Sequence, residues 1–302
     1  MKDFFKKIRR MLHNDIICEI KEQGVLNREL LNTVQSISKK MEWEMWQSRL
    51  RQDNIRHALM GPIYEDIVLT VGKKQLGWMA TLEHIIDTKC SFARFGDGEL
   101  KLMLRDEYDN GFQKNSYSIQ QCLRNVLLDD VDNLLIGFPT PPHSLHWANV
   151  WADIWYQLKP LVSERQIWGN SHVSRPGFFR IVRHEGVVMW RKIWDKKRVK
   201  IITGENSRFD PIDILFDNVK DIQFEYSVPR DAFHDISRLV EKLAADKNTE
   251  LFLISLGPAG TILAYELAKE GKWALDIGHI NASYLSVFEG APGPESLPVI
   301  IK

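Results

Sequence analysis

The chain has few cysteines and no long apolar segment. Its three cysteines, Cys18, Cys90 and Cys122, are widely spaced and form no C-x-x-C pair, which favours a reducing cytoplasm. No apolar run approaches the ~20 residues that span a bilayer, and the N-terminus has no apolar signal-peptide core with a small-residue cleavage site. We therefore expect a cytoplasmic protein that is soluble or peripheral on the inner face of the membrane.

The chain also lacks net charge. Its 40 basic and 40 acidic residues cancel, so no global field favours nucleic acid and we expect no nucleic-acid partner. A local anion site is compatible with this balance. With 302 residues and 44% hydrophobic content, the chain is long enough for one large α/β domain with an appendage, or for two small domains.

The first quarter of the chain has no proline before Pro62 and only one glycine before residue 60, Gly24. Apolar residues recur there at helical spacing, through Leu26, Leu30, Val34, Ile37 and Met41. This pattern predicts an N-terminal helical region over residues 1–70. The same stretch is weakly heptad-like, which makes a homo-oligomer reasonable although the stretch is short and interrupted.

Residues 1–12 form a segment with two faces. Phe4, Phe5, Ile8, Met11 and Leu12 gather near one side, and basic residues occupy much of the other. Such a helix can lie on an anionic membrane as a peripheral contact. Packing against the domain or a second subunit explains the pattern equally well, so both interpretations stay open.

Beyond residue 70 the pattern changes to short apolar runs that alternate with helical segments. Strands are predicted at 91–95, 133–138, 199–203, 222–226, 251–256 and 274–277, and helices at 75–88, 145–158, 231–245 and 261–269. This order predicts an α/β fold, with a Rossmann-like, largely parallel sheet and helices on both faces. Residues 71–302 are therefore expected to form this α/β domain.

The run from Ser91 to Glu99 brings two carboxylates to the end of an apolar strand. On an extended chain alternate side chains point the same way, so Asp97 and Glu99 can present oxygens to one divalent cation, Mn²⁺ or Mg²⁺. Gly96 and Gly98 let a diphosphate approach the backbone, and Arg94 can supply positive charge on the same side. The alternative is an ordinary Gly-Asp-Gly turn with solvated acids.

A second candidate anion site opens the helix predicted after residue 256. Gly257 and Pro258 begin that helix, and the N–H groups of a helix N-terminus attract phosphate. Asp276 stands near the place of the ribose-binding acid in a dinucleotide fold, which keeps an NAD(P)-dependent oxidoreductase as an alternative. However, the full G-x-G-x-x-G is absent. A tight turn needed only for packing explains Gly257 equally well.

Further polar residues follow the other strands. Ser207 and Arg208 come after the strand at 199–203, where ligands gather in parallel sheets, and Glu205 can orient the arginine or take a proton. A surface ion pair between Glu205 and Arg208 is the alternative. Arg175, before Pro176, is either a rigid loop cation near the site or a solvated charge.

The last candidates are aromatic. His279 follows a strand and a glycine, and its imidazole can bind phosphate, bind metal or act as a base, although a structural histidine is more common in such a place. Trp147, Trp151 and Trp155 form an i, i+4 stripe. Such a stripe can stack on a sugar, but packing in a core explains it better.

Several of these segments follow one another in a fixed order. They are Arg94-Phe-Gly-Asp-Gly-Glu99, Ser174-Arg175-Pro176, Gly204-Glu205-Asn206-Ser207-Arg208, Pro229-Arg-Asp-Ala-Phe233, Leu256-Gly257-Pro258 and Asp276-Ile277-Gly278-His279. Together they resemble the bacterial GT-D-fold glycosyltransferases over roughly residues 75–285. The family usually carries acidic and aromatic residues after its D-I-G-H, where this chain reads Ile280-Asn281-Ala282-Ser283-Tyr284-Leu285.

The resemblance implies a metal-assisted transfer of a hexose from a nucleoside diphosphate sugar, in particular a UDP-sugar, to a glycan or glycoprotein acceptor. It implies metal ligands at Asp97 and Glu99, catalytic roles for Asp97, Glu99, Glu205 and His279, and substrate contacts from Arg94, Gly96, Gly98, Arg175, Ser207, Arg208, Gly257 and Pro258. If the transfer inverts the anomeric centre, Glu205, Asp210 and His279 are the candidate bases. A non-catalytic glycan-binding or scaffold protein that retains the fold is a further alternative.

Overall fold

The computed structural model describes residues 2–141 and 145–298, apart from the side chains of Lys2, Phe4, Phe5, Ile8, His57 and Leu145. Within the chain, contacts define two compact units, Met1–Gly61 and Pro62–Lys302. The sequence placed this boundary after residue 70. The difference arises because the end of the N-terminal helix packs as part of the second unit.

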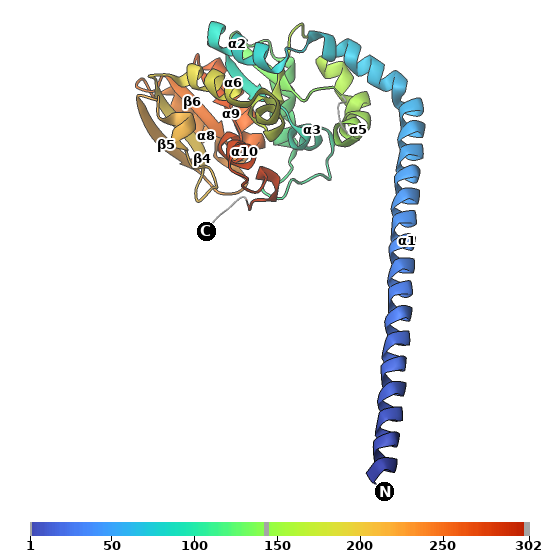
Figure 1. Ribbon diagram of the computed structural model, residues 1–302. Helices are drawn as coiled ribbons and strands as arrows, with labels where there is room; N and C mark the ends of the chain where they lie inside the picture. Colours follow the sequence, from blue (N-terminus) through green and yellow to red (C-terminus); the bar gives the residue numbers. More distant parts are fainter. Residues whose placement is uncertain (1, 142–144, 299–302) are drawn as a thin grey trace. The chain divides into compact units, whose positions relative to one another are not determined.

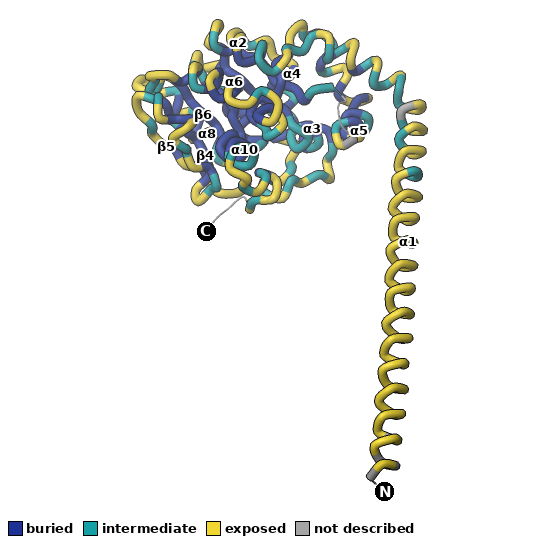
Figure 2. Tube along the Cα trace, in the orientation of Figure 1, coloured by how far each residue is buried: buried dark blue, intermediate teal, exposed yellow. Residues whose placement is uncertain are grey.

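The first unit is helical, as predicted, and forms a single helix with the start of the second. This helix, α1 (Lys2–Thr70), is exposed along almost all of the first unit (Figures 1 and 2). Of the apolar residues on which the membrane prediction depends, Phe4, Phe5 and Ile8 have side chains outside the described set, and Met11 and Leu12 are exposed. Among the described residues, no helix has the length and apolar character that a membrane span requires.

The second unit contains a seven-stranded sheet in the order β3-β2-β1-β7-β6-β4-β5, in which every described pairing is parallel. The strands are β1 (Ser91–Arg94), β2 (Leu134–Phe138), β3 (Gly169–Asn170), β4 (Arg198–Gly204), β5 (Asp221–Ser227), β6 (Leu251–Ser255) and β7 (Ala274–Asp276). All six predicted strands are present. The sequence missed β3 because two residues, a glycine and an asparagine, give no apolar run.

Helices cover both faces of the sheet, which confirms the predicted α/β class (Figure 1). One face carries α3 (Asp97–Leu104), α4 (Tyr117–Leu128), α5 (Leu145–Val162), α8 (Ile236–Ala244) and α9 (Pro258–Lys269). The other carries α2 (Trp78–Thr88), α6 (Pro176–Trp194), the short α7 (Asp213–Phe216) and α10 (Ile280–Phe288). Of these, the sequence did not predict α3, α4, α6, α7 or α10.

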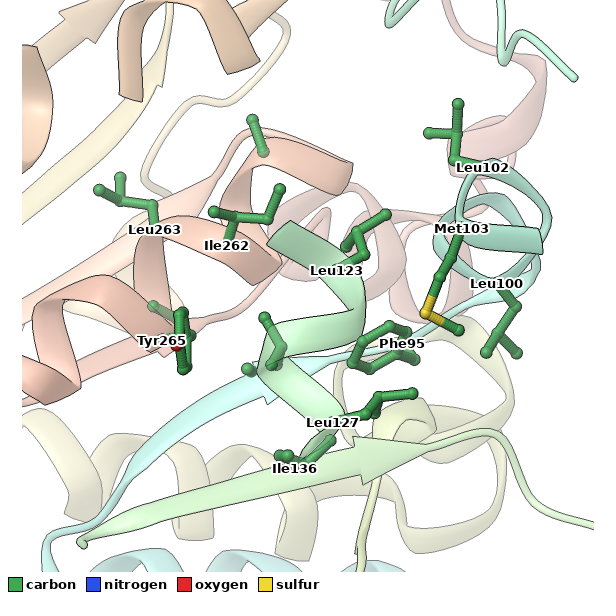
Figure 3. Close-up of a cluster of buried hydrophobic side chains, with 14 of the residues drawn as sticks. Phe95, Leu100, Leu102, Met103, Leu123, Leu127, Ile136, Ile262, Leu263 and Tyr265 are labelled. Carbon is green, nitrogen blue, oxygen red and sulfur yellow. The ribbon is translucent and has the colours of Figure 1, made fainter. Parts of the chain in front are cut away.

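The two cores arise from strand alternation. Phe92 faces one core and Ala93 the other, and the same holds for Leu135 and Ile136. Figure 3 shows the core on the α3 and α9 side, where Phe95 and Met103 lie near Leu123 from α4. Because both faces are covered, the strands β1, β2 and β6 are buried at every position, whereas β5 alternates between exposed and more buried residues.

The tryptophan stripe of α5 divides between core and groove. Trp151 is fully buried and Trp155 nearly so, which confirms packing for two of the three residues. Trp147 is only partly buried and lines a hollow described below. The stripe therefore anchors α5 and presents one ring to the site.

The final turns of α1 belong to the second unit and pack against the rest of it. Ile67 and Val71, directly after the helix, are fully buried. The Asp66 carboxylate accepts hydrogen bonds from Trp155 Nε1 at 2.9 Å and Lys159 Nζ at 2.8 Å. These contacts lower the pKa of Asp66, so the carboxylate stays charged in its bonded state.

We predict that deletion of residues 1–61 leaves the urea midpoint of the second unit unchanged. Extending the deletion through Val71 is expected to lower the free energy of unfolding, because burying Ile67 and Val71 contributes about 1.5–3 kcal/mol each. Equilibrium unfolding followed by tryptophan fluorescence compares the two truncations. If the shorter deletion also unfolds the protein, the unit boundary is wrong.

Candidate functional site

Three adjoining hollows lie at the carboxyl ends of the strands, where ligands gather in open parallel sheets. The Arg208 hollow is lined by residues that include Phe112, Gly204, Ser207, Arg208, Gly257 and His279. The Glu99 hollow shares Gly257 and His279 with it and adds Arg94, Glu99 and Asp276. The Asp97 hollow shares Trp147, His172 and Arg175 with the Glu99 hollow. Because each hollow shares lining residues with the next, we refer to the three together as the groove.

A buried ion pair stands at the centre of this groove. Arg94 at the end of β1 donates from Nη2 to Asp276 Oδ1 at the end of β7, at 2.9 Å. Arg94 Nη1 also donates to Ser171 O and to Ser174 Oγ, at 3.2 and 2.7 Å. Arg94 therefore lines the groove as predicted, but its guanidinium is already engaged by protein groups.

The ion pair leaves no space for a side chain at position 278, which is a glycine. Its φ is +50°, and a Cβ built there would lie 2.2 Å from Arg94 Nη2. The Gly278 N–H donates to Asp276 Oδ1 at 3.0 Å, which ties the turn to the ion pair. The glycine of the D-I-G-H motif thus lets β7 turn sharply past the guanidinium and places His279 in the groove.

The carboxylates Asp97 and Glu99 are not on an extended segment, so the predicted geometry is wrong. They lie in the first turn of α3. In a helix, side chains two residues apart point to nearly opposite sides, since each residue turns the chain by about 100°. Accordingly Glu99 lines the Glu99 hollow and Asp97 the Asp97 hollow. The strand was predicted correctly, but the sequence gave no warning that a helix starts directly after Gly96.

Glu99 caps its own helix and is partly desolvated. Its Oε2 accepts a hydrogen bond from Gly96 N at 2.7 Å. Burial, followed by the charge of Asp276, raises the pKa of Glu99 above its usual range. A Cβ at Gly96 would lie 2.9 Å from Glu99 Oε2, so this glycine gives the carboxylate its space. Gly98 lies within α3 beside Asn110.

Asp97 is more open. Its Oδ2 lies 3.7 Å from His146 Nε2 and 3.8 Å from Lys101 Nζ. Within the described residues, no group of three His, Cys, Asp or Glu side chains is placed to hold a metal. A cation at Asp97 therefore needs oxygen ligands from outside the protein, as is usual for Mg²⁺ bound to substrate phosphates. Asp97, with His146 beside it, fits that arrangement; Glu99 faces elsewhere.

Arg208 and His279 form a bonded pair in the Arg208 hollow. Arg208 Nη2 lies 3.0 Å from His279 Nε2, and because a guanidinium only donates, Nε2 is the acceptor and Nδ1 carries the proton. Burial and the charges of Arg208, Arg175 and Arg94 hold the pKa of His279 well below its usual range. His279 is therefore neutral at pH 7 with its lone pair occupied, which does not suit it to act as a base.

The C-terminal segment reaches the same arginines. Arg208 Nη1 donates to Leu297 O at 2.5 Å, and Arg175 Nη1 lies 3.3 Å from Glu295 Oε1. Glu295 and Arg175 both line the Asp97 hollow. Two of the predicted phosphate-binding residues are thus held by acceptors of the chain's own tail, in positions that an anionic ligand can take.

The remaining polar candidates, Glu205, Ser207 and Asp210, do not line the hollows that contain the Asp97 and Glu99 carboxylates. Glu205 is exposed and lines a fourth hollow with Asn206 and Tyr226, which adjoins the Arg208 hollow through shared lining residues but does not include the carboxylates. Ser207 Oγ pairs with Thr203 Oγ1 at 2.6 Å and accepts from Phe209 N, so it shapes the turn that carries Arg208. Asp210 is exposed and lines none of these hollows. The predicted surface ion pair between Glu205 and Arg208 is not among the described contacts.

The helix α9 begins at Pro258, directly after Gly257, which is three residues earlier than the helix predicted at 261–269. Gly257 has φ +55°, and a Cβ there would lie 2.5 Å from the Phe112 ring. The Phe112 backbone carbonyl accepts from Asp231 N at 2.8 Å, so two loops far apart in sequence close over this turn. Sequence reasoning missed Phe112, because a single aromatic residue in a loop carries no pattern.

The segment that departs from the family pattern after His279 is buried in α10. Asn281 donates to the carbonyl of Asp210 at 3.1 Å, and Tyr284 packs on Phe179 and Phe288. None of the residues from Ile280 to Leu285 lines the three hollows. These positions therefore support the loop that bears Arg208 and do not form the groove wall.

We predict that Asp276→Asn lowers the free energy of unfolding by about 3–5 kcal/mol, because it leaves the buried Arg94 charge without its partner. Urea unfolding of Asp276→Asn, Arg94→Met and the double variant measures the coupling, and the double variant is expected to lose less than the sum. The exposed pair Lys269–Glu266 is the control, and Glu266→Gln is expected to cost about 0–1 kcal/mol. Equal losses at both pairs would contradict the central place of Arg94–Asp276.

Comparisons with known proteins find relatives of this chain among glycosyltransferases. The family model described as "Glycosyltransferase GT-D fold" matches residues 92–292, which include every strand except the first residue of β1. Glycosyltransferase GlyD of Streptococcus pneumoniae is 26% identical over 229 residues, covering 68% of this chain and 26% of the relative. A probable glycosyl transferase, Gly of Streptococcus gordonii, is 26% identical over 224 residues, covering 68% and 31%. The chain thus spans roughly a quarter to a third of these relatives.

Solved structures show the same fold. A glycosyltransferase (DUF1792) from Streptococcus sanguinis superposes with a TM-score of 0.65 at 23% identity, covering 72% of this chain and 85% of that one. A second structure of this domain, described as having a distinct glycosyltransferase fold, gives 0.65 at 22% identity over 78% and 86%. The match of the family model over two thirds of the chain decides the assignment: this chain belongs to the GT-D-fold glycosyltransferase family.

Proposed function

We propose that this protein transfers a hexose from a nucleoside diphosphate sugar, with UDP as the nucleotide, to a glycan or glycoconjugate acceptor. One observation carries the proposal. Arg94, Arg175 and Arg208 converge around a neutral His279; Asp276 neutralises the first, and the tail carboxylate of Glu295 pairs with the second. Such a cluster suits a ligand with two or more negative charges.

The diphosphate is assigned to Arg208 and Arg175. As the glycosidic bond breaks, negative charge grows on the leaving diphosphate, and fixed guanidinium groups stabilise that charge. The tail acceptors Glu295 and Leu297 engage these arginines at present, so the donor must displace them. The Nδ1–H of His279 remains as a neutral donor at the same place.

The acceptor is assigned to the Asp97 hollow. Trp78 and Trp147 line it together with Ile181, and the faces of aromatic rings can stack on a sugar. A divalent cation, Mn²⁺ or Mg²⁺, fits at Asp97 and would neutralise charge on the leaving group. Glu99, whose pKa is raised, is the described carboxyl best suited to exchange a proton at neutral pH.

The nicotinamide alternative loses its support. Its ribose-binding candidate, Asp276, is buried and bonded to Arg94 and to Gly278 N, and the Phe112 ring covers the Gly257 turn.

The other alternative, a non-catalytic protein that retains the fold, differs from an enzyme because it binds the donor without turning it over. A thermal-shift panel of nucleotide sugars with and without manganese, followed by a hydrolysis or transfer assay, separates binding from turnover.

We predict that Arg208→Ala weakens binding of UDP by roughly tenfold to a hundredfold, the loss of one charge-assisted contact of about 1.5–3 kcal/mol. Uridine is expected to lose much less, because it has no diphosphate. Arg208→Lys should recover only part of the affinity, since a point charge cannot make a planar, two-pronged contact. Calorimetric titration of UDP and uridine measures all three proteins. Equal losses for both ligands would assign Arg208 to structure alone.

We predict different results for the two carboxylates of the D-x-E motif. Asp97→Asn should abolish the gain in UDP affinity that manganese gives. Glu99→Gln should keep that gain, because a glutamine oxygen still accepts from Gly96 N, but should lower sugar transfer. Titrations with and without manganese provide the readout that does not depend on activity. If both variants lose the manganese effect equally, both carboxylates bind the cation and Glu99 must leave its cap.

A further inference from the structure

The first unit exposes a row of large apolar side chains along the part that the structure describes, for example Ile20 at 65% and Val34 at 54%. A helix in water is stabilised mainly by packing of an apolar face, and contiguous exposed apolar surface marks an interaction site. We therefore expect another protein or lipid surface to cover this helix, and the pattern of its residues indicates which.

The apolar residues between Ile16 and Met41 follow a seven-residue repeat. Ile20, Asn27, Val34 and Met41 lie seven residues apart, at a positions, and Ile16, Gln23, Leu30 and Ile37 occupy the d positions between them. Six of these eight side chains are apolar, and the two polar ones are both amides. This is the spacing of a coiled-coil seam.

The opposite side of the same segment is polar. Of its exposed large apolar residues outside the seam, Ile17, Leu26 and Leu31 flank it at e and g positions, and only Val25 lies opposite, at an f position. The polar side carries both signs of charge, with Glu22 and Glu29 beside Lys21 and Arg28. A helix that lies on an anionic membrane instead needs a mainly basic polar face.

Asn27 indicates the kind of partner. A single asparagine at an a position costs stability in an apolar seam but fixes register, because it is satisfied only when it meets the same residue of another copy. β-Branched residues at the neighbouring a positions, Ile20 and Val34, favour two parallel strands when leucine stands at d, as Leu30 does between them. We propose that residues 16–41 form a parallel, in-register, two-stranded coiled coil with the same segment of a second copy of this chain.

The association is tested on the full-length protein. Sedimentation equilibrium is expected to give the mass of two chains, and the variant with Leu30→Asp and Ile37→Asp is expected to give the mass of one. Val25→Asp is the matched control, because it places the same charge on the same helix away from the seam, and it should remain dimeric. A wild-type mass of one chain, or of more than two, would overturn the proposal.

Register and direction are tested by disulfide formation. In a Cys18→Ser background, Val34→Cys is expected to form an intermolecular disulfide with oxidised glutathione, since equivalent a positions approach within disulfide distance only in a parallel, in-register pair. Ser36→Cys, two residues away on the polar side, is the control and should remain mostly a thiol. Equal crosslinking at the two positions, no crosslinking at position 34, or monomeric binding to anionic vesicles would each refute the assignment.

Discussion

The ion pair between Arg94 and Asp276 is the constraint on which the site depends. It joins the ends of β1 and β7, which are neighbours in the sheet although 182 residues separate them in sequence. Arg94 also holds the loop that contains Ser171 and Ser174, and its backbone carbonyl accepts from Thr261 of α9 at 2.7 Å. A single buried guanidinium thus fixes the relative positions of the groove walls, and it keeps its charge because Asp276 compensates it.

The two members of this ion pair shift the pKa values of different groups in the groove. Asp276 adds to the effect of burial and raises the pKa of Glu99, whereas Arg94, with Arg208 and Arg175, lowers the pKa of His279. The carboxyl side therefore tends to hold a proton and the imidazole side tends to release one. An anion entering the Arg208 hollow finds cationic and neutral donors, and the hollow is also lined by one acid, Asp231, beside Arg230.

The two units of the chain meet different physical requirements. The second packs apolar side chains in two cores, one on each side of the sheet. The first exposes large apolar side chains along its described length, and its printed side-chain contacts are local, such as Arg56–Asp53. Because packing of an apolar face is what mainly stabilises a helix in water, the proposed coiled coil would supply the packing that the first unit lacks within the chain, whereas the second unit contains the candidate site.

The sequence alone determined six of the seven strands, the α/β class and the helical character of the N-terminal region, because apolar periodicity and the distribution of glycine and proline are local properties. It also located Arg94, Arg208 and His279 at or just after strand ends, and Arg175 in a connecting segment before Pro176, where they are found. It could not determine that α3 begins at Asp97, which separates the two carboxylates, since strand and helix both tolerate D-G-E. Only the tertiary structure decided that Arg94 pairs with Asp276 and that His279 accepts from Arg208. Those partners are distant in the chain, and hydrogen bonds between distant residues leave no periodic signal in sequence.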